Sequence, residues 1–474
     1  MDLMNSFLPL KKYKFIKLQF FFFLYAILIL YLSSINMLFP LLLPFLAIIM
    51  ALIIVFPKYI WYIFILSFFY QYPLLEKLNI RVVLSDILFP IFLLSYFGNF
   101  VVNGVRTTNF KPNKRVITIH TLLFVIAIIS MLINLPTYKH YKMWASSIWY
   151  LYRFSQILVA LFVFSDDNSE INLENVVRII IWGSVLQFFA ALIQMHTLEY
   201  TTLFYARSDI SGTLAPHHSV LGTFLLIPIF LTTEKFLKCT DTKDKIRFLA
   251  MLIVLILTLI FSGSRSSITG LALSLTILIL INFKLNIQYL FFILALVLAV
   301  FSLLIFSPLG SLISMTVNSA ETGGMDISSA SRFFIWRNAI IYFFNSNWLQ
   351  KLLGFGIGTY MYHQNMDYLW LGLNFNSGAH NNFLHVLCET GIIGLVIFIA
   401  LAILLLHQLW PHPSKSKYNN SLFYATIAMF GSSFTQETFW FQKSFGVLWL
   451  FYIFILTIVL RDNKKSLISN WKSS

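Results

Sequence analysis

Long apolar runs organise the chain from Leu18 to Leu460. They are roughly 17 to 25 residues long, and each can cross a hydrocarbon core of about 30 Å as a helix. No run alternates polar and apolar residues, and lipid requires every backbone group to find a partner within the protein, so helices are favoured over a barrel. The pattern predicts an all-α polytopic membrane protein with about fourteen transmembrane helices (12–14), in a single domain over residues 1–474. The predicted spans cover residues 18–37, 40–56, 59–75, 82–99, 116–134, 147–164, 175–195, 218–233, 248–262, 267–282, 286–306, 383–406, 421–437 and 444–460.

Composition supports a membrane protein and argues against a nucleic-acid partner. The chain is 59% hydrophobic and only 11% charged, whereas soluble domains run near about 25% charged residues. Its net charge of +15 would indicate nucleic-acid binding only if the basic residues clustered on one exposed face. They are spread instead over short loops between apolar runs, so membrane lipids are the expected surroundings.

The distribution of basic residues predicts the orientation of the chain in the membrane. With the N-terminus in the cytoplasm, the loops on that side hold 21 of the 33 Lys and Arg residues, and the loops on the other side hold ten. This asymmetry follows the positive-inside rule and places both termini in the cytoplasm. It also places three segments outside, over residues 196–217, 262–266 and 307–382. In the long loop 307–382, aromatic residues and isoleucines at near-helical spacing predict a short amphipathic helix from Ser329 to Phe344 along the membrane surface.

The sequence SGSRSS, with Arg265 between two apolar runs, is the first candidate for chemistry. A guanidinium is permanently charged and forms two-pronged hydrogen bonds with phosphate oxygens, so Arg265 beside serines suits a lipid phosphate. The alternative is an arginine that anchors a helix end by reaching to the interface.

A second polar segment, ARSDISGTLAPHHS, precedes the apolar run that starts near residue 218. Arg207 is a candidate for a second anion ligand, with an ordinary polar loop as the alternative. The adjacent His217 and His218 point about 100° apart at a helix start, and no Cys or carboxylate stands at a ligand spacing. We therefore expect no metal site.

The long loop holds the third group, in SRFFIWRNAI, LLGFGIGTY and GAHNNFLHVLCETGIIGL. The glycines of LLGFGIGTY lack the strand and helix of a dinucleotide-binding unit, so they indicate a tight turn. His380 lies just before a predicted span, where a neutral imidazole can take a proton from a sugar hydroxyl near pH 7. The alternative is a histidine with a purely structural role.

Asp86, Arg153 and Glu389 are ionisable residues within predicted spans. An ionisable group there costs at least about 2.5 kcal/mol, which makes each a candidate for function. The alternative is a hydrogen bond between packed helices, and Gly391 and Gly394 beside Glu389 are typical of close helix packing. The sequence does not identify which of these charges pair.

Together these motifs resemble the O-antigen ligase and polymerase superfamily of bacterial membrane glycosyltransferases, from about Asp86 to Gly394. Each motif is weak alone, but their order and their placement relative to the spans are specific. The residues that carry the resemblance are Asp86, Arg207, Gly212, Pro216, Arg265, Arg332, Trp336, Gly354, Gly356, Gly358, His380, Asn381, Glu389, Gly391 and Gly394.

The resemblance implies a metal-independent, inverting transfer of an oligosaccharide from an undecaprenyl diphosphate carrier to an acceptor glycan, without a cofactor. The reaction would take place at the outer face of the bacterial cytoplasmic membrane. His380 would be the general base, and Arg207, Arg265 and Arg332 would bind the donor diphosphate and stabilise the leaving group. Arg332 is preferred over Arg337 because it matches the family position and the two lie about 140° apart on a helix. Asp86, Trp336, Asn381 and Glu389 are candidate supporting residues.

Several functions remain open within and beyond this resemblance. A polymerase extends a carrier-linked chain, and the divergent, aromatic-rich sequence favours a protein adapted to one repeat unit; a chain-length regulator would then be an expected partner. A ligase uses the same donor but acts on the lipid A core. A flippase or transporter of lipid-linked sugar would show two pseudo-symmetric halves, whereas here the polar residues concentrate in one outside loop. A purely structural assembly partner would not need His380 or Arg265.

Overall fold

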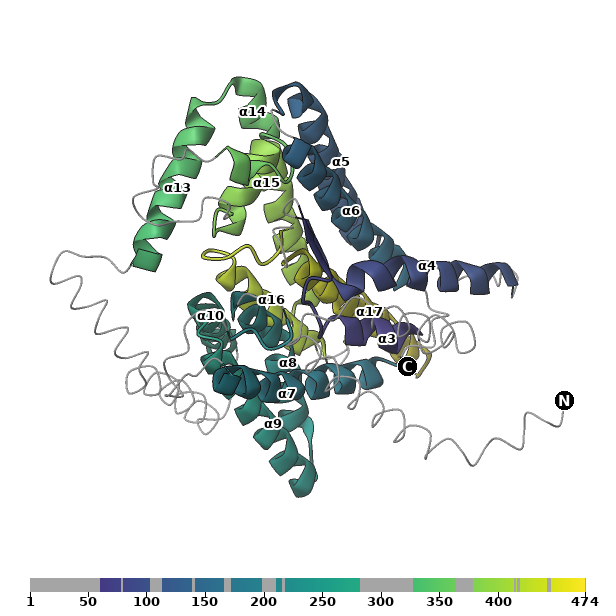
Figure 1. Ribbon diagram of the computed structural model, residues 1–474. Coiled ribbons are helices and arrows are strands. Elements are labelled where there is room, and N and C mark those ends of the chain that lie inside the picture. The colour runs from purple at the N-terminus through teal and green to yellow at the C-terminus, as the bar shows by residue number, and fades with distance from the viewer. Residues whose placement is uncertain are drawn as a thin grey trace. The chain divides into compact units, whose positions relative to one another are not determined.

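The computed structural model describes residues 60–77, 80–102, 113–138, 141–165, 172–197, 210–214, 218–281, 327–363, 378–412, 415, 418–440 and 445–473. From Trp61 onward these residues belong to one unit, Trp61–Ser474. Apart from one short hairpin, the regular elements of the described residues are helical (Figure 1). The elements are α3 (Ile60–Ser67), β1 (Leu75–Lys77), β2 (Ile80–Val82), α4 (Leu84–Val102), α5 (Lys114–Asn134), η3 (Leu135–Thr137), α6 (Tyr141–Val163), α7 (Leu173–Thr197), α8 (His218–Lys238), α9 (Thr242–Phe261), α10 (Arg265–Ile281), α13 (Ile327–Asn345), α14 (Trp348–Leu353), η4 (Tyr360–Tyr362), α15 (Asn382–Leu409), α16 (Asn419–Ser432) and α17 (Phe445–Ser473).

Six helical segments among the described residues are long and apolar enough to cross a membrane: Lys114–Thr137, Tyr141–Val163, Leu173–Gln194, His218–Lys238, Asn382–Leu409 and Gly446–Asn463. Two shorter helices, Leu84–Leu93 and Arg265–Ile281, are also apolar. An all-α membrane fold therefore fits, but a count of fourteen spans is not confirmed. The predicted spans 18–37, 40–56 and 286–306 lie outside the described residues.

The predicted span over residues 59–75 is wrong, because α3 already ends at Ser67. The chain then turns, Gln71 N donates to Thr213 O at 2.8 Å, and β1 pairs with β2 in an antiparallel hairpin. Phe68, Phe69 and Tyr70 are nonetheless buried. Hydropathy reports burial rather than conformation, so an apolar run in a protein core can carry a turn as readily as a helix.

The predicted span over residues 421–437 is also too long. Helix α16 ends at Ser432, and Ser433 N closes its last turn on Met429 O and Phe430 O. Residues 433–440 continue without helical structure, although most are buried. Glu437 therefore lies in an irregular segment between α16 and α17 rather than inside a transmembrane helix.

Helices α8, α10 and α16 pack together and fix the direction of the bundle. Gly222 near the start of α8 lies against Ser264 and Ser267, and Gly270 of α10 lies against Ala428 and Ser432 of α16. Ser274 Oγ donates to Tyr424 O at 2.7 Å, so α10 and α16 run antiparallel. The start of α8, Arg265 and the end of α16 therefore share one end of this group, which we call the arginine end.

The opposite end, which we call the lysine end, is held by Glu174 of α7. Its carboxylate pairs with Lys235 of α8 and accepts a hydrogen bond of 2.5 Å from Tyr418 OH, just before α16. Helix α15 reaches the same end, where Asn419 Nδ2 donates to Leu409 O at 2.7 Å. Because Asn382 N donates to Ser433 O at 2.8 Å, α15 begins at the arginine end.

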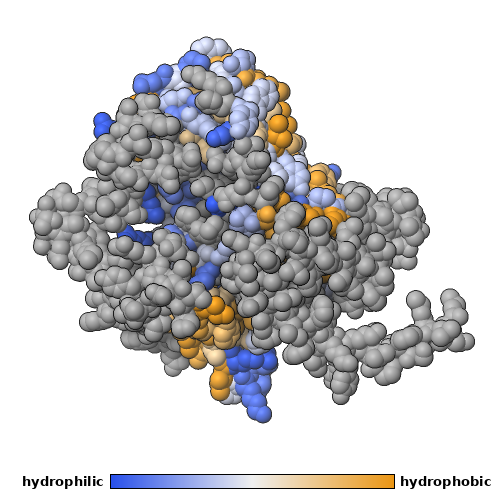
Figure 2. All heavy atoms as spheres, viewed as in Figure 1, coloured by the Kyte–Doolittle hydropathy of each residue, from blue (hydrophilic) through white to orange (hydrophobic). Residues whose placement is uncertain are grey.

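The α8–α9 connection and the first turns of α9 continue from the lysine end and are rich in exposed charge, with Asp241, Lys243, Lys245 and Arg247 on the surface. Figure 2 shows hydrophilic residues at the tip of α9, lowest in the view, and hydrophobic residues directly above it. A polar tip beneath an apolar body is typical of a helical hairpin that leaves a membrane.

Helix α15 is broken at Gly391, whose φ of 69° lies in the left-handed region. The glycine segment Gly354–Gly358 fills the break: Phe355 N donates to Cys388 O at 2.8 Å, and Gly356 N to Glu389 O at 3.3 Å. All three glycines of this segment have positive φ, which confirms the tight turn. A Cβ at Gly354 would approach Glu389 backbone atoms to 2.3 Å, so only glycine permits this contact. The N–H groups of Phe355 and Gly356 thus bind a broken helix rather than a phosphate.

Candidate functional site

His380 occupies a strained position immediately before α15. Its φ of 47° makes it the only non-glycine residue with positive φ in the described part of the chain. This conformation costs about 1–3 kcal/mol, so surrounding contacts must hold it, and such strain clusters at functional sites. The His380 side chain is 22% exposed, which leaves the imidazole reachable from outside.

Two asparagines after His380 tie it to the segment that follows α16. Asn381 caps α15, since its Oδ1 accepts from Leu384 N at 3.1 Å, and its Nδ2 donates to Phe434 O at 3.0 Å. Asn382 Oδ1 accepts from Phe439 N at 3.1 Å. The candidate residue Asn381 thus has a defined structural task, which is to dock residues 433–440 against His380.

This docking places the carboxylate of Glu437 beside His380. Glu437 Oε1 accepts a hydrogen bond from the backbone N–H of His380, and Oε2 lies 3.8 Å from His380 Nδ1. The second distance exceeds a hydrogen bond but is within ion-pair range, and such contacts commonly tighten when substrate binds. With Nδ1 turned to the carboxylate, Nε2 is the nitrogen left to act as a base.

Glu437 is ionised despite being fully buried. Burial alone would raise the pKa of its carboxyl, but the nearby His380 and His385 and the hydrogen bonds they supply outweigh burial and lower the pKa to about 2. A buried anion next to an imidazole favours the protonated form of that imidazole. The pair therefore suits a histidine that accepts a proton during a reaction.

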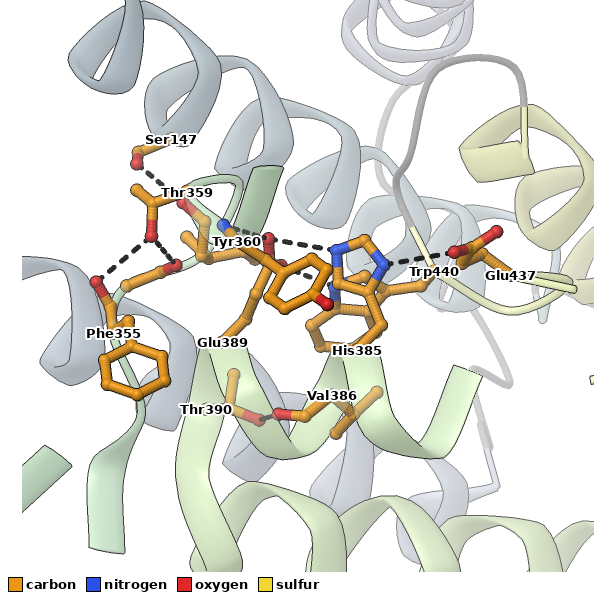
Figure 3. Close-up of polar contacts among 12 residues, drawn as sticks. Ser147, Phe355, Thr359, Tyr360, His385, Val386, Glu389, Thr390, Glu437 and Trp440 are labelled. Carbon is orange, nitrogen blue, oxygen red and sulfur yellow. Dashed lines mark hydrogen bonds and ion pairs between the residues drawn. The ribbon is translucent and has the colours of Figure 1, made fainter. Parts of the chain in front are cut away.

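His385, one turn into α15, lies between two carboxylates (Figure 3). Its Nε2 is 3.1 Å from Glu389 Oε1, and its Nδ1 is 3.6 Å from Glu437 Oε1. The histidine and Glu389 are each 1% exposed and Glu437 is 0% exposed. Neither contact has hydrogen-bond geometry, but both lie within ion-pair range. A ring between two buried carboxylates at these distances is favoured electrostatically when it is positive, so the arrangement fits an imidazolium.

Glu389 joins this cluster to the glycine segment. Its Oε2 accepts from Trp440 Nε1 at 2.6 Å, and its Oε1 accepts from Tyr360 N at 3.3 Å (Figure 3). The Tyr360 ring lies 5.3 Å from the ring of His385. Glu389 is thus buried and fully engaged, and it does not reach the surface itself.

Arg265 and Arg207 are two of the three predicted diphosphate ligands. Arg265 is the first residue of α10 and lies at the arginine end. Helix α15 begins at the same end, and His380 lies just before it. The hydroxyls next to it are linked, with Ser264 Oγ 2.7 Å from Ser267 Oγ, and Ser267 Oγ 3.2 Å from Thr223 of α8. Arg207 lies outside the described residues.

Arg332 and Arg337 lie on different faces of helix α13. Cys388 Sγ of α15 donates to Ala339 O at 3.8 Å, so the Ala339 face of α13 packs on α15. Arg332 lies seven residues before Ala339, only about 20° around the helix, whereas Arg337 lies about 160° away. Arg332 is accordingly half-buried and Arg337 is exposed. Trp336 is half-buried on the same helix.

Asp86 forms a buried ion pair. Its Oδ2 lies 2.9 Å from Arg153 of α6 and accepts from Val83 N at 3.0 Å. The same guanidinium donates to Arg81 O of β2 at 2.9 Å. The pair joins α6 to the hairpin and to the start of α4.

No group of three or more His, Cys, Asp or Glu side chains in the described ranges is arranged to hold a metal ion. In the cluster formed by His380, His385, Glu389 and Glu437, the side chains contact one another, Trp440 and backbone N–H groups. Imidazole and carboxylate groups of this kind can accept a proton and stabilise a positive charge.

The helices define a multi-pass membrane protein, with a buried cluster of His and Glu side chains at one end of its bundle. Residues 250–399 match the protein family described as O-Antigen ligase. The match confirms the resemblance to the O-antigen ligase and polymerase superfamily over this part of the chain. The matched residues include Arg265, Arg332, His380 and Glu389 but not Glu437. No curated protein matches the chain.

Sequence reasoning missed Glu437, Trp440 and the position of His385 between two carboxylates. Glu437 was included at the end of a predicted span, and an ionisable residue at membrane depth is a functional candidate by default. That rule, applied to residues 421–437 as it was to Glu389, would have singled it out. Its pairing with His380 has no local signal, because 57 residues separate the two.

Proposed function

We propose that the protein is a surface-polysaccharide polymerase that transfers an oligosaccharide from an undecaprenyl diphosphate carrier to a carrier-linked acceptor glycan. The observation that supports this most strongly is the buried, ionised Glu437 against His380, at the end of the bundle that also holds Arg265. A base and a cation at the same end of the bundle are what an inverting transfer from a glycosyl diphosphate needs.

The reaction follows from these groups. His380 Nε2 takes the proton of the acceptor hydroxyl, and the hydroxyl oxygen forms a bond to the anomeric carbon from the face opposite the diphosphate. The bond between that carbon and the diphosphate oxygen breaks, which inverts the carbon and leaves the carrier with the electron pair. Arg265, Arg332 and Arg207 stabilise the growing charge on the leaving oxygen. Glu437 stabilises the imidazolium formed on His380.

The arginine end is proposed to face the outside of the cell. The lysine end and the α8–α9 connection carry Lys235, Lys243, Lys245 and Arg247, and basic loops of this kind remain in the cytoplasm. Helix α8 crosses from the arginine end to the lysine end, so the two ends lie on opposite sides of the membrane in this proposal. The starts of α10 and α15 at the arginine end add positive helix-dipole charge that favours a diphosphate.

A ligase that transfers the glycan to the lipid A core is the second candidate, because the matched family is described as O-Antigen ligase. Both candidates share the donor and the site and differ only in the acceptor. Deleting the gene and separating the host's lipopolysaccharide on a gel distinguishes them. If the protein is a polymerase, the deletion strain is expected to make a core that carries one repeat. A core without any repeat would show that the protein is a ligase instead. A normal ladder would contradict both.

A further inference from the structure

His385 contacts both buried carboxylates of the site and does not itself lie at the surface. We propose that His385 is a positioning residue whose imidazolium holds Glu437 against His380 and Glu389 against the glycine segment Gly354–Gly358. This inference rests on the proposed role of His380 as the general base. It assigns a task to a histidine that the mechanism above does not use.

The need for a cation follows from burial. Glu389 and Glu437 both lie against the same imidazole ring, at 3.1 and 3.6 Å, and neither carboxylate reaches solvent. Two buried anions around one neutral ring would repel each other without compensation, and a buried charge that loses its partner is strongly destabilising. A positive His385 balances one of the two charges and attracts both carboxylates to fixed places.

The cluster also connects the base to the glycine segment. Glu389 accepts a hydrogen bond from Tyr360 N, two residues after Gly358. It accepts another from Trp440 Nε1, three residues after Glu437. Ser147 Oγ donates to Ile357 O at 2.6 Å and fixes the same segment to α6. His385 thus lies between Glu389, which binds the end of the glycine segment, and Glu437, which contacts His380. Loss of the His385 side chain is therefore expected to move Glu437 relative to His380.

The charges of the cluster suit the proposed reaction. Two carboxylates and one imidazolium leave a single net negative charge beside His380. When His380 accepts the proton of the acceptor, the whole cluster becomes neutral, which stabilises the charge that develops in the transition state. The low pKa of Glu437, about 2, keeps this carboxylate ionised, so it orients and stabilises His380 and does not carry the proton onward.

The test uses the full-length protein in vesicles of phosphatidylethanolamine and phosphatidylglycerol. Its substrate is the lipid-linked glycan extracted from membranes of a strain that lacks the gene. His385→Gln is expected to lower kcat about tenfold or more and to change KM for this glycan less than about twofold, because the arginines that bind the diphosphate are intact. The matched control is His407→Gln, an exposed histidine near the far end of the same helix, which is expected to keep the wild-type kcat.

A second variant separates charge from packing. In the double variant His385→Gln with Glu389→Gln, one negative charge is removed together with the positive one, and the two amides can hydrogen-bond to each other. It is expected to accumulate better than His385→Gln and to regain at least about threefold in kcat. If the single variant does not accumulate at all, the double variant is still expected to accumulate and to transfer glycan.

The proposal is overturned if His385→Gln keeps kcat within about twofold of wild type, if it changes KM alone, or if the double variant is no better than the single one in both accumulation and kcat. Failure of the proposed function is a different result. In that case His380→Ala itself would transfer the glycan at the wild-type rate.

Discussion

The carboxylate of Glu437 contacts His380 twice, through a hydrogen bond from its backbone N–H and through an approach of 3.8 Å to its Nδ1. The first contact supports a strained backbone with φ of 47°, and the second leaves Nε2 to face substrate. One residue therefore fixes the backbone of the proposed base and lies beside its Nδ1. A carboxylate that orients a catalytic imidazole in this way stabilises the imidazolium without taking its proton.

Glu437→Gln is expected to reduce polymer formation about a hundredfold or more, because an amide neither attracts the imidazolium nor fixes its tautomer. Polymer is measured on gels from a gene-deletion strain that expresses the variant, with protein in the membrane quantified in parallel. Glu234→Gln is the matched control, since Glu234 pairs with Lys238 at the lysine end. Wild-type polymer from Glu437→Gln would remove this residue from the mechanism.

Arg332→Ala and Arg337→Ala form a matched pair on one helix. Arg332 lies on the face of α13 that packs on α15, whereas Arg337 is exposed on the opposite face. Loss of a charge-assisted contact with phosphate costs about 1.5–3 kcal/mol, so Arg332→Ala should slow transfer about tenfold to a hundredfold. Arg337→Ala should keep the wild-type rate. The reverse order in the same transfer assay would assign the diphosphate to Arg337.

Asp86→Asn is expected to destabilise the protein rather than to alter its chemistry. Its carboxylate and Arg153 form a buried pair at 2.9 Å, and breaking such a pair costs about 3–5 kcal/mol. Thermal unfolding of the detergent-solubilised protein should show a lower midpoint for Asp86→Asn and a smaller loss for Asp86→Asn with Arg153→Met. A midpoint unchanged by Asp86→Asn would contradict the structural role of the pair.

Stability in acid provides a prediction about Glu437 alone. The folded state lowers the pKa of its carboxyl from 4.5 to about 2, so ionised Glu437 contributes stability that is fully present above pH 4.5 and is lost as the pH falls toward 2. The difference in thermal midpoint between wild type and Glu437→Gln, measured in detergent, should therefore be largest near neutral pH. The difference should narrow below pH 4.5, and a constant difference across this range would argue against an ionised Glu437.

The sequence was sufficient for the parts of the site that have local signals. Apolar runs predicted the long helices α5 to α8 and α15, and the spacing of aromatic residues predicted α13 within a few residues of its observed bounds, Ile327–Asn345. The glycines of LLGFGIGTY were expected to make a turn, and positive φ at Gly354, Gly356 and Gly358 confirms it. Each of these features depends on residues that are near one another in the chain.

Contacts between distant segments were beyond sequence reasoning. The turn directly after Ser67 lies in the buried apolar residues Phe68 to Tyr70, which hydropathy cannot distinguish from helix. The irregular segment after Ser432 is mostly buried as well, although it mixes polar and aromatic residues. Asp86 and Arg153 were recognised as intramembrane charges, but 67 residues separate them and nothing local indicated the pair. The contact of His385 with Glu437 likewise depends on how Asn381 and Asn382 dock the segment before α17.

The most direct test of the proposed base is the transfer of lipid-linked glycan by purified His380→Ala in vesicles, compared with wild type and with His407→Ala, which changes an exposed histidine near the lysine end. At equal amounts of inserted protein, His380→Ala is expected to form glycosidic bonds at least about a hundredfold more slowly, because a general base contributes about 10² to 10⁴ to the rate. His407→Ala should match wild type. Transfer by His380→Ala at the wild-type rate would contradict the assignment of His380 as the base.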